Sequence, residues 1–341
     1  MTGVDIKSIL RKLFRWLVPL GISGLALWLV LRGIEMNVFI SHLSRIGWQT
    51  YLFASLVYFI SFSFRAFCWY ILLRQKVSYK IAFFTMGAGY LLNNIFPFRL
   101  GEIGRAVLLD DPKGVSGLTV LSSILVERML DVFLAAMFML LMLPRIFDGN
   151  LDQHLIVIAL ILAAIGLTVL FLIARFRNKI STWMAGWKTK SKFIKNWFQP
   201  KVIQLMEGLS IMDKPILFLA AFGSLVLSWF LAFGQNFIVF RSIYPAPPFW
   251  WMIFVLSAAA FGAALPSAPA GWGVFEGVKV AAFALLGVEA ELAFTLAIVV
   301  HLMAFVYASL IGLIGLRMQG EALISFYQRV IRRKPEVQMV E

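Results

Sequence analysis

The chain has 341 residues, of which 61% are hydrophobic and only 14% are charged, and its formal net charge is +14. A soluble protein could not bury so much apolar surface, so this composition indicates a multi-pass membrane protein. In so hydrophobic a chain, cytoplasmic loops explain the excess of Lys and Arg, and we therefore expect no nucleic-acid partner.

The long apolar runs lack the alternation of β-barrel strands, so we predict an all-α fold. Six runs are long enough to cross a hydrocarbon core of ~30 Å at about 1.5 Å per residue. The predicted spans are residues 16–32, 48–73, 117–143, 155–174, 215–240 and 292–317. No small-residue cleavage site follows the first run, so we expect it to remain as a span.

The charges of the connecting loops predict the orientation of these spans. The N-terminal segment is rich in Lys and Arg, whereas the 144–154 loop has one Arg and two Asp. Because Lys and Arg accumulate in cytoplasmic loops, we predict that both termini are cytoplasmic. The predicted organisation is a basic N-terminus (1–15), one transmembrane domain (16–317) that includes a basic interfacial segment (175–214), and a basic cytoplasmic tail (318–341).

Residues 81–109 form an apolar stretch that is broken near its middle. Both of its neighbours are predicted to be cytoplasmic, so the stretch must enter and leave the membrane on the same side. Pro97 removes a helix hydrogen bond, and Gly101 and Gly104 favour a turn. The leg after the break, residues 101–109, would be only about 13 Å long as a helix. We therefore predict a re-entrant hairpin whose tip lies near the membrane midplane.

Residues 249–287 form a second broken apolar stretch, interrupted by Pro266, Pro269, Gly271 and Gly273. Its flanks are poor in Lys, so both of its ends are predicted to lie outside the cell. Its legs are longer than those of the first stretch. The sequence leaves open whether they form a second re-entrant hairpin or two full spans.

The two broken stretches share a charge pattern. In each of them a Pro/Gly break is followed by a glutamate and, three residues later, by a base: Glu102 and Arg105, then Glu276 and Lys279. The loop charges give the two units opposite orientations. Together these features predict an inverted-topology repeat with a substrate site where the broken segments meet. The predicted repeats are about residues 48–143 and 215–317.

The tips of the hairpins are predicted to form an anion site. The second leg of each hairpin begins at the tip, so its free N–H groups and its positive dipole end point toward the midplane. The basic residues Arg99, Arg105 and Lys279 add positive charge there. The candidate binding and translocation residues are Asn93, Asn94, Pro97, Arg99, Gly101, Glu102, Arg105, Glu127, Arg128, Asp131, Pro269, Gly271, Gly273, Glu276 and Lys279, with Arg65 as a further candidate.

Charges also occur within the predicted spans. Each costs about 2.5–3.5 kcal/mol at the centre of a span on insertion scales, so each needs a partner or a task. Glu127 and Asp131 are four residues apart and share a helix face, and Arg65, Arg99 and Arg105 are their candidate partners. This network either fixes helix packing or forms a gate beside the anion site. Asn93 and Asn94 either bind the ligand or satisfy the broken backbone.

The sequence contains no pattern typical of a metal site, a cofactor site or a catalytic site. It has one cysteine, Cys68, and three scattered histidines, His42, His154 and His301. Metal-ligand spacing, a phosphate-binding loop and a nucleophile–base arrangement are missing. We therefore expect no cofactor and no catalytic residue, and we interpret His301 as a packing residue in an apolar helix.

Three motifs resemble those of the lysylphosphatidylglycerol synthase transmembrane-region family, which is flippase-like: NNIFPFRLGEIGRA (93–106), SSILVERMLD (122–131) and PAGWGVFEG (269–277). The likeness covers about residues 10–320. In multiple peptide resistance factors, the similar module moves aminoacylated phosphatidylglycerol between leaflets and precedes a soluble synthase domain. We expect no such domain here, because the chain ends soon after its last predicted span.

The residues and the resemblance together predict a lipid flippase of the cytoplasmic membrane. Its substrate would be a phosphate-bearing lipid, either an aminoacylated phospholipid or a polyprenyl-phosphate-linked sugar. The expected partner is an anionic membrane lipid, and the sequence leaves open a lipid-modifying synthase partner and an oligomer. The alternatives are a membrane enzyme that transfers an aminoacyl or glycosyl group to lipid, and a scaffold subunit of such a synthase.

Overall fold

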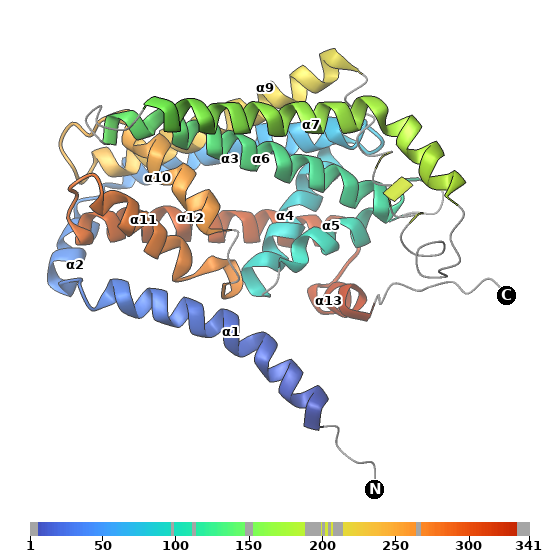
Figure 1. The fold of residues 1–341 in the computed structure, drawn as a ribbon. Helices are drawn as coiled ribbons and strands as arrows, with labels where there is room; N and C mark the ends of the chain where they lie inside the picture. The colour runs from blue at the N-terminus through green and yellow to red at the C-terminus, as the bar shows by residue number, and fades with distance from the viewer. Residues whose placement is uncertain are drawn as a thin grey trace, which may run out of the picture.

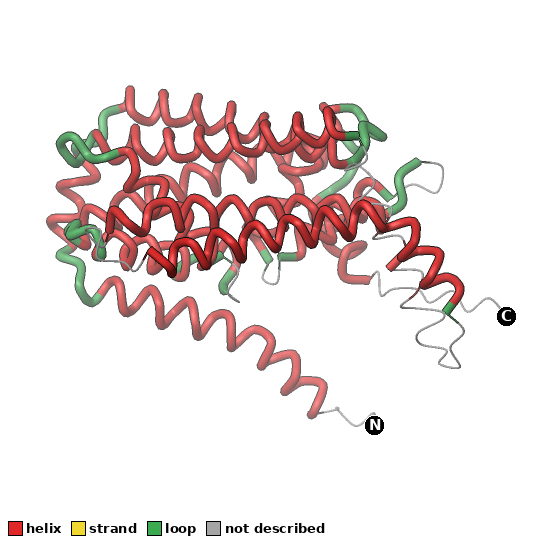
Figure 2. Tube along the Cα trace, turned by 45° about the horizontal axis from the view of Figure 1, so that its top comes forward, coloured by secondary structure: helices red, strands yellow, loops and turns green. Residues whose placement is uncertain are grey.

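The computed structural model describes residues 6–96, 99–110, 114–146, 153–187, 199, 202–203, 206, 214–263 and 267–332. Nearly all of these residues are helical, and the only β-structure among them is an isolated bridge between Asp110 and Val115. Most of the helices lie side by side in one bundle, while the N-terminal half of α1 diverges from it (Figures 1 and 2). The predicted all-α fold is therefore confirmed.

Three of the described helices are long and apolar enough to cross a membrane: α3 (Trp48–Leu72), α9 (Pro215–Arg241) and α12 (Ala290–Met318). The apolar part of α1 (Ile6–Leu31) and α2 (Met36–Ser44) would form a fourth span if this pair, bent by 87°, is counted as one. Two other long helices are α6 (Gly117–Ile146) and α7 (Gln153–Gly186). Each predicted span thus lies on a helix, and those on α3, α9 and α12 agree with it to within two residues. The other three helices are longer than predicted: α1 begins at Ile6 instead of residue 16, α6 ends at Ile146 instead of 143, and α7 continues to Gly186 instead of ending near residue 174.

Each broken stretch forms a helical hairpin. The first consists of α4 (Tyr79–Ile95) and α5 (Leu100–Leu109), and the second of α10 (Phe249–Gly262), the short 3₁₀ helix η3 (Pro269–Gly271) and α11 (Val274–Ala284). At about 1.5 Å per residue, the longest of these helices would be about 25 Å, shorter than a hydrocarbon core of ~30 Å. In Figure 1 the two hairpins approach from opposite ends of the bundle, α4 and α5 on the right and α10 and α11 on the left.

The prediction that Gly101 and Gly104 favour a turn is wrong, because both residues lie inside α5. A Cβ atom on Gly101 would lie 1.8 Å from the backbone oxygen of Gly89, so glycine at this position allows α5 to pack directly against α4. The turn precedes these glycines. Arg99, the N-cap of α5, has a left-handed φ of 51° there.

The helices pack as two similar four-helix units, α3–α6 and α9–α12. The contacts of α3 with α4 and α6 correspond to those of α9 with α10 and α12, and each hairpin packs on the last helix of its own unit. Between the units, α3 packs along α9, α4 packs against α12, and α10 packs against α6. Two helices outside the units cover the hairpins: α1 contacts α11, and α13 (Leu323–Arg332) contacts α5 and buries Phe326 and Val330.

Candidate functional site

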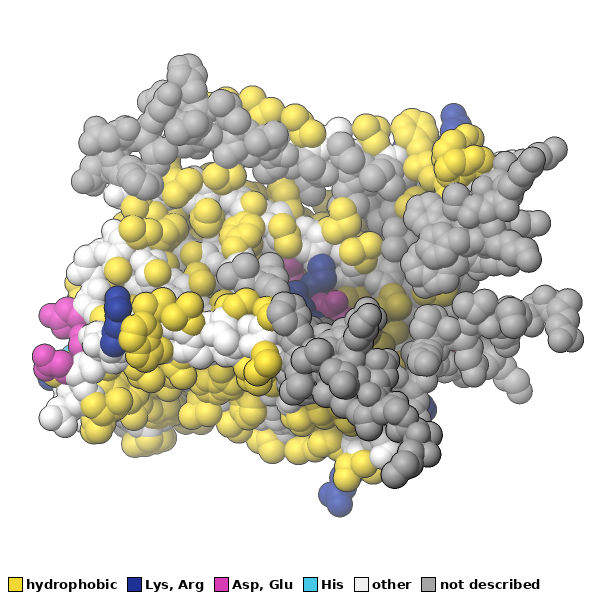
Figure 3. Space-filling view, turned by 60° about the horizontal axis from the view of Figure 1, so that its bottom comes forward, with side chains coloured by type: hydrophobic (Ala, Val, Ile, Leu, Met, Phe, Trp, Pro, Cys, Tyr) yellow, Lys and Arg dark blue, Asp and Glu magenta, His cyan; other side chains and the backbone are white. Residues whose placement is uncertain are grey.

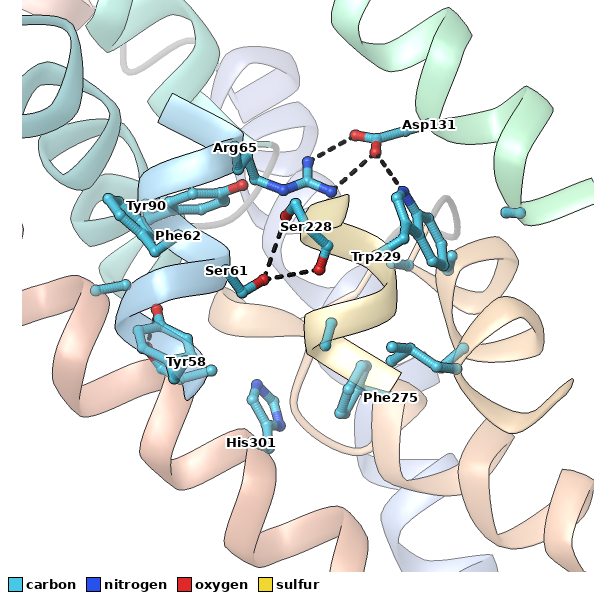
Figure 4. Close-up of a pocket in the computed structure, with 18 of the residues that line it drawn as sticks. Tyr58, Ser61, Phe62, Arg65, Tyr90, Asp131, Ser228, Trp229, Phe275 and His301 are labelled. Atoms are coloured by element: carbon cyan, nitrogen blue, oxygen red, sulfur yellow. Dashed lines mark hydrogen bonds and ion pairs between the residues drawn. The ribbon is translucent and has the colours of Figure 1, made fainter. Parts of the chain in front are cut away.

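The tips of the two hairpins meet between the two units, at residues that are exposed in the structure. The guanidinium of Arg99 donates a hydrogen bond to the carbonyl oxygen of Ala263, at the end of α10, and α4 contacts η3. A cavity of about 450 Å³ lies beside this junction, and all the long helices of both units contribute to its walls. Figure 4 shows side chains from both units that point into it. The hairpin tips therefore form part of an open cavity between the two units.

The cavity has apolar walls with polar groups placed among them. Its polar and charged lining residues are Tyr58, Ser61, Arg65, Tyr90, Asn94, Arg99, Arg128, Asp131, Ser228, Trp229, Gln235 and His301. Apolar walls with a few converging polar groups are typical of small-molecule and lipid head-group sites. Figure 3 shows a largely hydrophobic outer face with basic and acidic side chains visible near its centre.

Asp131 is the acidic residue that faces the cavity. Both of its carboxylate oxygens accept from Arg65 at 2.8 Å, and one also accepts from the indole of Trp229 at 3.0 Å (Figure 4). These bonds connect α3, α6 and α9. A bidentate Arg–carboxylate pair fixes both side chains, so it gives the cavity a rigid wall.

Glu127, one turn from Asp131, is fully buried behind that wall. It accepts from Arg128 at 2.6 Å, from Arg105 at 3.1 Å and from Arg65 at 3.4 Å. The resulting network contains three arginines and two acids, so its net charge is +1. A buried charge is tolerated only when it is paired and hydrogen-bonded, and here every member has a partner of opposite sign. We call these five residues the buried charge network.

The structure shows which of the candidate bases pair with the two acids. Arg65 and Arg105 do so, and Arg128 folds back on its own helix to join them, whereas Arg99 does not. Arg105 also lies over the ring of Trp69, with its guanidinium carbon 4.6 Å from the ring centroid, and it is not among the cavity-lining residues. Arg105 therefore supports the site from within the protein.

Arg99 differs from the other arginines of the site. Among the described residues, no carboxylate lies within ion-pair distance of its guanidinium, whose recorded bond is to the carbonyl of Ala263. It projects from the tip of the first hairpin into the cavity. Among the described lining residues, Arg99, Arg65 and Arg128 are three cations that face a single acid, Asp131, so this charged lining is positive by two.

The two asparagines of the first hairpin serve different contacts. The side-chain oxygen of Asn93 accepts from the backbone N–H of Gly101 at 2.7 Å, which ties the two legs together. Asn94 lines the cavity and donates to the Phe305 carbonyl at 3.1 Å and to the Ser309 hydroxyl at 2.9 Å, both on α12. Both asparagines thus satisfy backbone groups, and Asn94 also faces the cavity.

Two further candidates of the first hairpin do not add to the cavity. Glu102, in the first turn of α5, is partly exposed and makes no side-chain hydrogen bond or ion pair within the described ranges. It does not line the cavity. Pro97 lies outside the described residues.

The tip of the second hairpin is organised by Glu276. One of its carboxylate oxygens accepts from the backbone N–H of Gly273, the N-cap of α11, at 2.7 Å, and the other contacts Nδ1 of His301 on α12. Pro269 and Gly271 lie in η3, and Gly271 and Gly273 have left-handed φ values of 83° and 85°. This glutamate therefore acts within the protein, where it connects the hairpin tip to α12.

Lys279, one turn along α11, is fully buried. Its ammonium donates to the side-chain oxygen of Asn236 at 2.8 Å and lies 4.6 Å from the ring centroid of Phe275. It does not line the cavity. Lys279 thus holds the second hairpin against α9, much as Arg105 holds the first hairpin against α6.

The structure brings five of the sequence candidates to the cavity and adds residues that the sequence analysis missed. The five are Arg65, Asn94, Arg99, Arg128 and Asp131. The additions include His301, interpreted above as a packing residue, and Ser228, Trp229 and Gln235 of α9. Ser228 and Gln235 are two turns apart in an otherwise apolar helix, so their shared face was the available signal.

Gln235 has a feature that points to a ligand. Its side chain lines the cavity and is 4% exposed, yet its amide nitrogen has no hydrogen-bond partner among the described residues. A buried amide without a partner costs about 1–3 kcal/mol, which a bound polar ligand would recover. Among the described residues, no group of three or more His, Cys, Asp or Glu could hold a metal ion.

Comparison with known proteins gives one match. A family model described as the lysylphosphatidylglycerol synthase TM region matches residues 16–312, which include the first four-helix unit, the second unit except the end of α12, and all the described residues that line the cavity. No curated protein and no solved structure matches the chain.

Proposed function

Since the chain belongs to the lysylphosphatidylglycerol synthase TM region family, we propose that it is a flippase that moves a phosphate-bearing lipid between the leaflets of the cytoplasmic membrane. Family membership and the membrane-capable helices establish a multi-pass membrane module related to lipid synthesis or transport. We further propose that the protein moves the lipid between leaflets, that the lipid carries a phosphate, and that the membrane is the cytoplasmic membrane.

In this proposal, each four-helix unit contributes two spans and one re-entrant hairpin, and the units have opposite orientations in the membrane. Three observations support the arrangement: the matching contacts of α3–α6 and α9–α12, the short hairpin helices, and their approach from opposite ends of the bundle. With α1 and α7 this gives six spans and two hairpins. Both termini and residues 175–214 then lie on the cytoplasmic side, where their basic charge favours them.

The observation that carries the proposal is the position of Arg99. It lies at the junction of the two hairpin tips, faces the cavity and has no carboxylate partner among the described residues. A phosphate oxygen would give its guanidinium the charge-assisted bonds that the protein does not supply. Arg65 and Arg128 add positive charge beside it, while Arg105 and Lys279 keep the hairpins in position. The acyl chains would stay in the surrounding lipid.

The charges of the cavity also bear on the choice between the two substrate classes. Asp131, the acid that faces the cavity, is already occupied by Arg65, Arg128 and Trp229, so the ammonium of an aminoacylated head group would find no free carboxylate among the described lining residues. It would also meet three arginines, and like charges oppose binding. The unpartnered amide of Gln235 suits a hydroxyl group, which both donates and accepts. These features favour a phosphate-linked sugar as the substrate.

The test uses purified protein in proteoliposomes with two fluorescent probes, a polyprenyl-phosphate sugar and an aminoacylated phosphatidylglycerol. We expect the wild-type protein to bind and translocate the sugar lipid in preference to the aminoacylated one. In Arg99→Ala the charge-assisted bonds to phosphate are lost, so affinity should fall about ten- to a hundredfold. Arg99→Lys should keep part of that affinity, because lysine retains the charge but lacks the planar fork.

The matched control is Arg32→Ala, which removes an exposed arginine that lies over the ring of Trp28 at the end of α1. Its binding and transport should equal those of the wild type. A folded Arg99→Ala protein with wild-type translocation of both lipids would overturn the proposed phosphate site. Preference for the aminoacylated lipid would leave the flippase proposal standing and overturn the assignment of the sugar class.

A further inference from the structure

His301 lies between two groups that accept hydrogen bonds. Its Nδ1 contacts a carboxylate oxygen of Glu276, and its Nε2 lies 3.2 Å from the carbonyl oxygen of Ala270. The imidazole is also stacked on Trp272, with ring centroids 4.3 Å apart. These contacts fix the ring in the cavity wall, at the point where the second hairpin turns.

The hydrogen-bond partners of His301 determine how many protons it shares with Glu276. A carbonyl oxygen only accepts, so Nε2 must carry a hydrogen, and a neutral imidazole then has none left for Nδ1. A second proton must therefore lie between Nδ1 and the Glu276 carboxylate, or two lone pairs would face each other. The other carboxylate oxygen of Glu276 already accepts from Gly273. The pair thus holds one exchangeable proton, and with it the pair is neutral overall.

The surroundings of the pair determine what loss of this proton would do. On α11 the nearby charge is Lys279, which bonds to the neutral side chain of Asn236 on α9. From the first hairpin Arg99 faces the same cavity, and from α3 the phenol of Tyr58 does so. Arg65 of α3 and Arg128 and Asp131 of α6 also line the cavity, and Ser23 of α1, whose hydroxyl accepts from the backbone N–H of Ala268, packs against the tip. Release of the proton would leave a negative charge on the pair, beside described lining charges that are positive by two.

We propose that the Glu276–His301 pair is a proton-binding site whose loading is coupled to the binding and movement of the lipid. This inference rests on the proposed function. A phosphate in the cavity and a deprotonated pair in its wall would be two negative charges that repel each other, so the anionic lipid binds together with a proton. By thermodynamic linkage, the factor by which the bound lipid raises the affinity for the proton equals the factor by which the bound proton raises the affinity for the lipid.

The pair is also placed to move the hairpin tip. It joins α12 to Ala270 and to the N-cap of α11, and Ala270 has a left-handed φ of 59°. When the proton leaves, the contact between Glu276 and His301 becomes repulsive, so one of the contacts that hold the tip on α12 is lost. The proton enters and leaves through this one site, and no covalent bond other than that to the proton is made or broken. The proton gradient would thereby supply the energy for transport.

The first experiment measures lipid affinity and translocation as functions of pH with the fluorescent polyprenyl-phosphate sugar. For the wild type we expect affinity to fall as the pH rises, and translocation to respond to an imposed pH gradient. Glu276→Gln keeps both contacts, because its amide can donate to His301 and accept from Gly273, but it cannot exchange a proton. Its lipid affinity should no longer change with pH, and the response to the gradient should be lost.

The matched control is Glu289→Gln, the same change at an exposed position before α12. It should keep the pH dependence of the wild type. Two outcomes would overturn the proton site: a wild-type translocation rate that does not change with pH, or a Glu276→Gln protein that keeps the full pH dependence of lipid affinity. Neither outcome would contradict the flippase proposal.

A second measurement tests the site without transport. Nitrogen-15 NMR of histidine-labelled protein, with His301 assigned by His301→Gln, reports whether its ring is an imidazolium or a neutral ring hydrogen-bonded to an acid. We expect one of these two signatures, lost at alkaline pH and altered in Glu276→Gln. A neutral ring that is insensitive to both changes would overturn the inference. Absence of any lipid binding combined with the expected NMR signature would instead overturn the proposed function.

Discussion

Glu127 forms ion pairs with all three arginines of the buried charge network. It is fully buried and accepts from three arginines that come from α3, α5 and α6. Each of these arginines would be costly to bury alone, and their mutual repulsion is offset by two acids. The sequence indicated that Glu127 and Asp131 need cations, but helical spacing could not show that Arg128 would turn back to join them. That contact depends on how far a long side chain bends.

Replacing Glu127 with Gln should destabilise the protein strongly. Arg105 would then have no acidic partner among the described residues, and Arg65 and Arg128 would share only Asp131. Removing one partner of a buried charge pair typically costs about 3–5 kcal/mol. We expect a lower midpoint of thermal unfolding in detergent and a smaller yield of monodisperse protein. Glu289→Gln, the same change at an exposed position, should leave the midpoint unchanged. An unaltered midpoint in Glu127→Gln would show that the network does not hold the helices together.

The first hairpin shows how an element can carry polar groups into an apolar bundle. Its legs approach closely at Gly89 and Gly101, and Asn93 caps the second leg by accepting from Gly101. The short α5 then directs Arg105 toward α6, and α13 covers its outer side with Phe326. Small residues let helix backbones meet in this way inside membranes, where no hydrophobic drive brings helices together.

Gly101→Ala should prevent this hairpin from closing. The new Cβ would lie 1.8 Å from the backbone oxygen of Gly89, which cannot move aside as a flexible side chain could. We expect loss of lipid binding together with aggregation on size-exclusion chromatography. The control is Gly223→Ala in α9, where a Cβ meets nothing within 4 Å and alanine is the better helix former. A Gly101→Ala protein that behaves like this control would contradict the packing of α5 on α4.

The positions of the long helices could be predicted from the sequence, but the helices that each one packs against could not. Apolar runs of about twenty residues fix where helices form because the bilayer sets their length. The hairpin helices were predicted from their Pro/Gly breaks. Gly101 and Gly104 of the first hairpin lie inside α5 and serve packing, whereas Gly271 and Gly273 of the second lie at its turn with left-handed φ values. α2 was missed because its nine residues are too few for a span. The shared polar face of Ser228 and Gln235 on α9 was visible in the sequence, but the sequence alone could not show that this face and His301 meet at one cavity, since this needs the relative rotation of helices from both units.

At the scale of the whole molecule, both units line one cavity, and the contact of Arg99 with Ala263 joins their hairpin tips beside it. The turn between α3 and α4 and the turn between α11 and α12 lie at opposite ends of the bundle (Figure 1). The proposed inverted repeat places these ends on opposite sides of the membrane. This arrangement can be tested directly because the chain has a single cysteine, Cys68, which is buried.

In a Cys68→Ala background, Lys76→Cys and Glu289→Cys introduce one thiol each into exposed turns at the two ends. A membrane-impermeant maleimide should label Glu289→Cys in intact cells and Lys76→Cys only in inside-out vesicles. Lys214→Cys, before α9, should be labelled like Lys76→Cys, only in inside-out vesicles. Labelling of Lys76→Cys and Glu289→Cys from the same side would contradict the inverted orientation of the units.

The surplus of arginines around the cavity has a consequence for the membrane as an electrical insulator. Three guanidinium groups and one carboxylate line the described part of the space, and the charges of Arg105 and Glu127 behind it cancel, so the site is positive by two. Fixed positive charge along a pathway repels sodium and potassium. In the proposed flippase, a phosphate-bearing head group could therefore pass without short-circuiting the ion gradients of the cell.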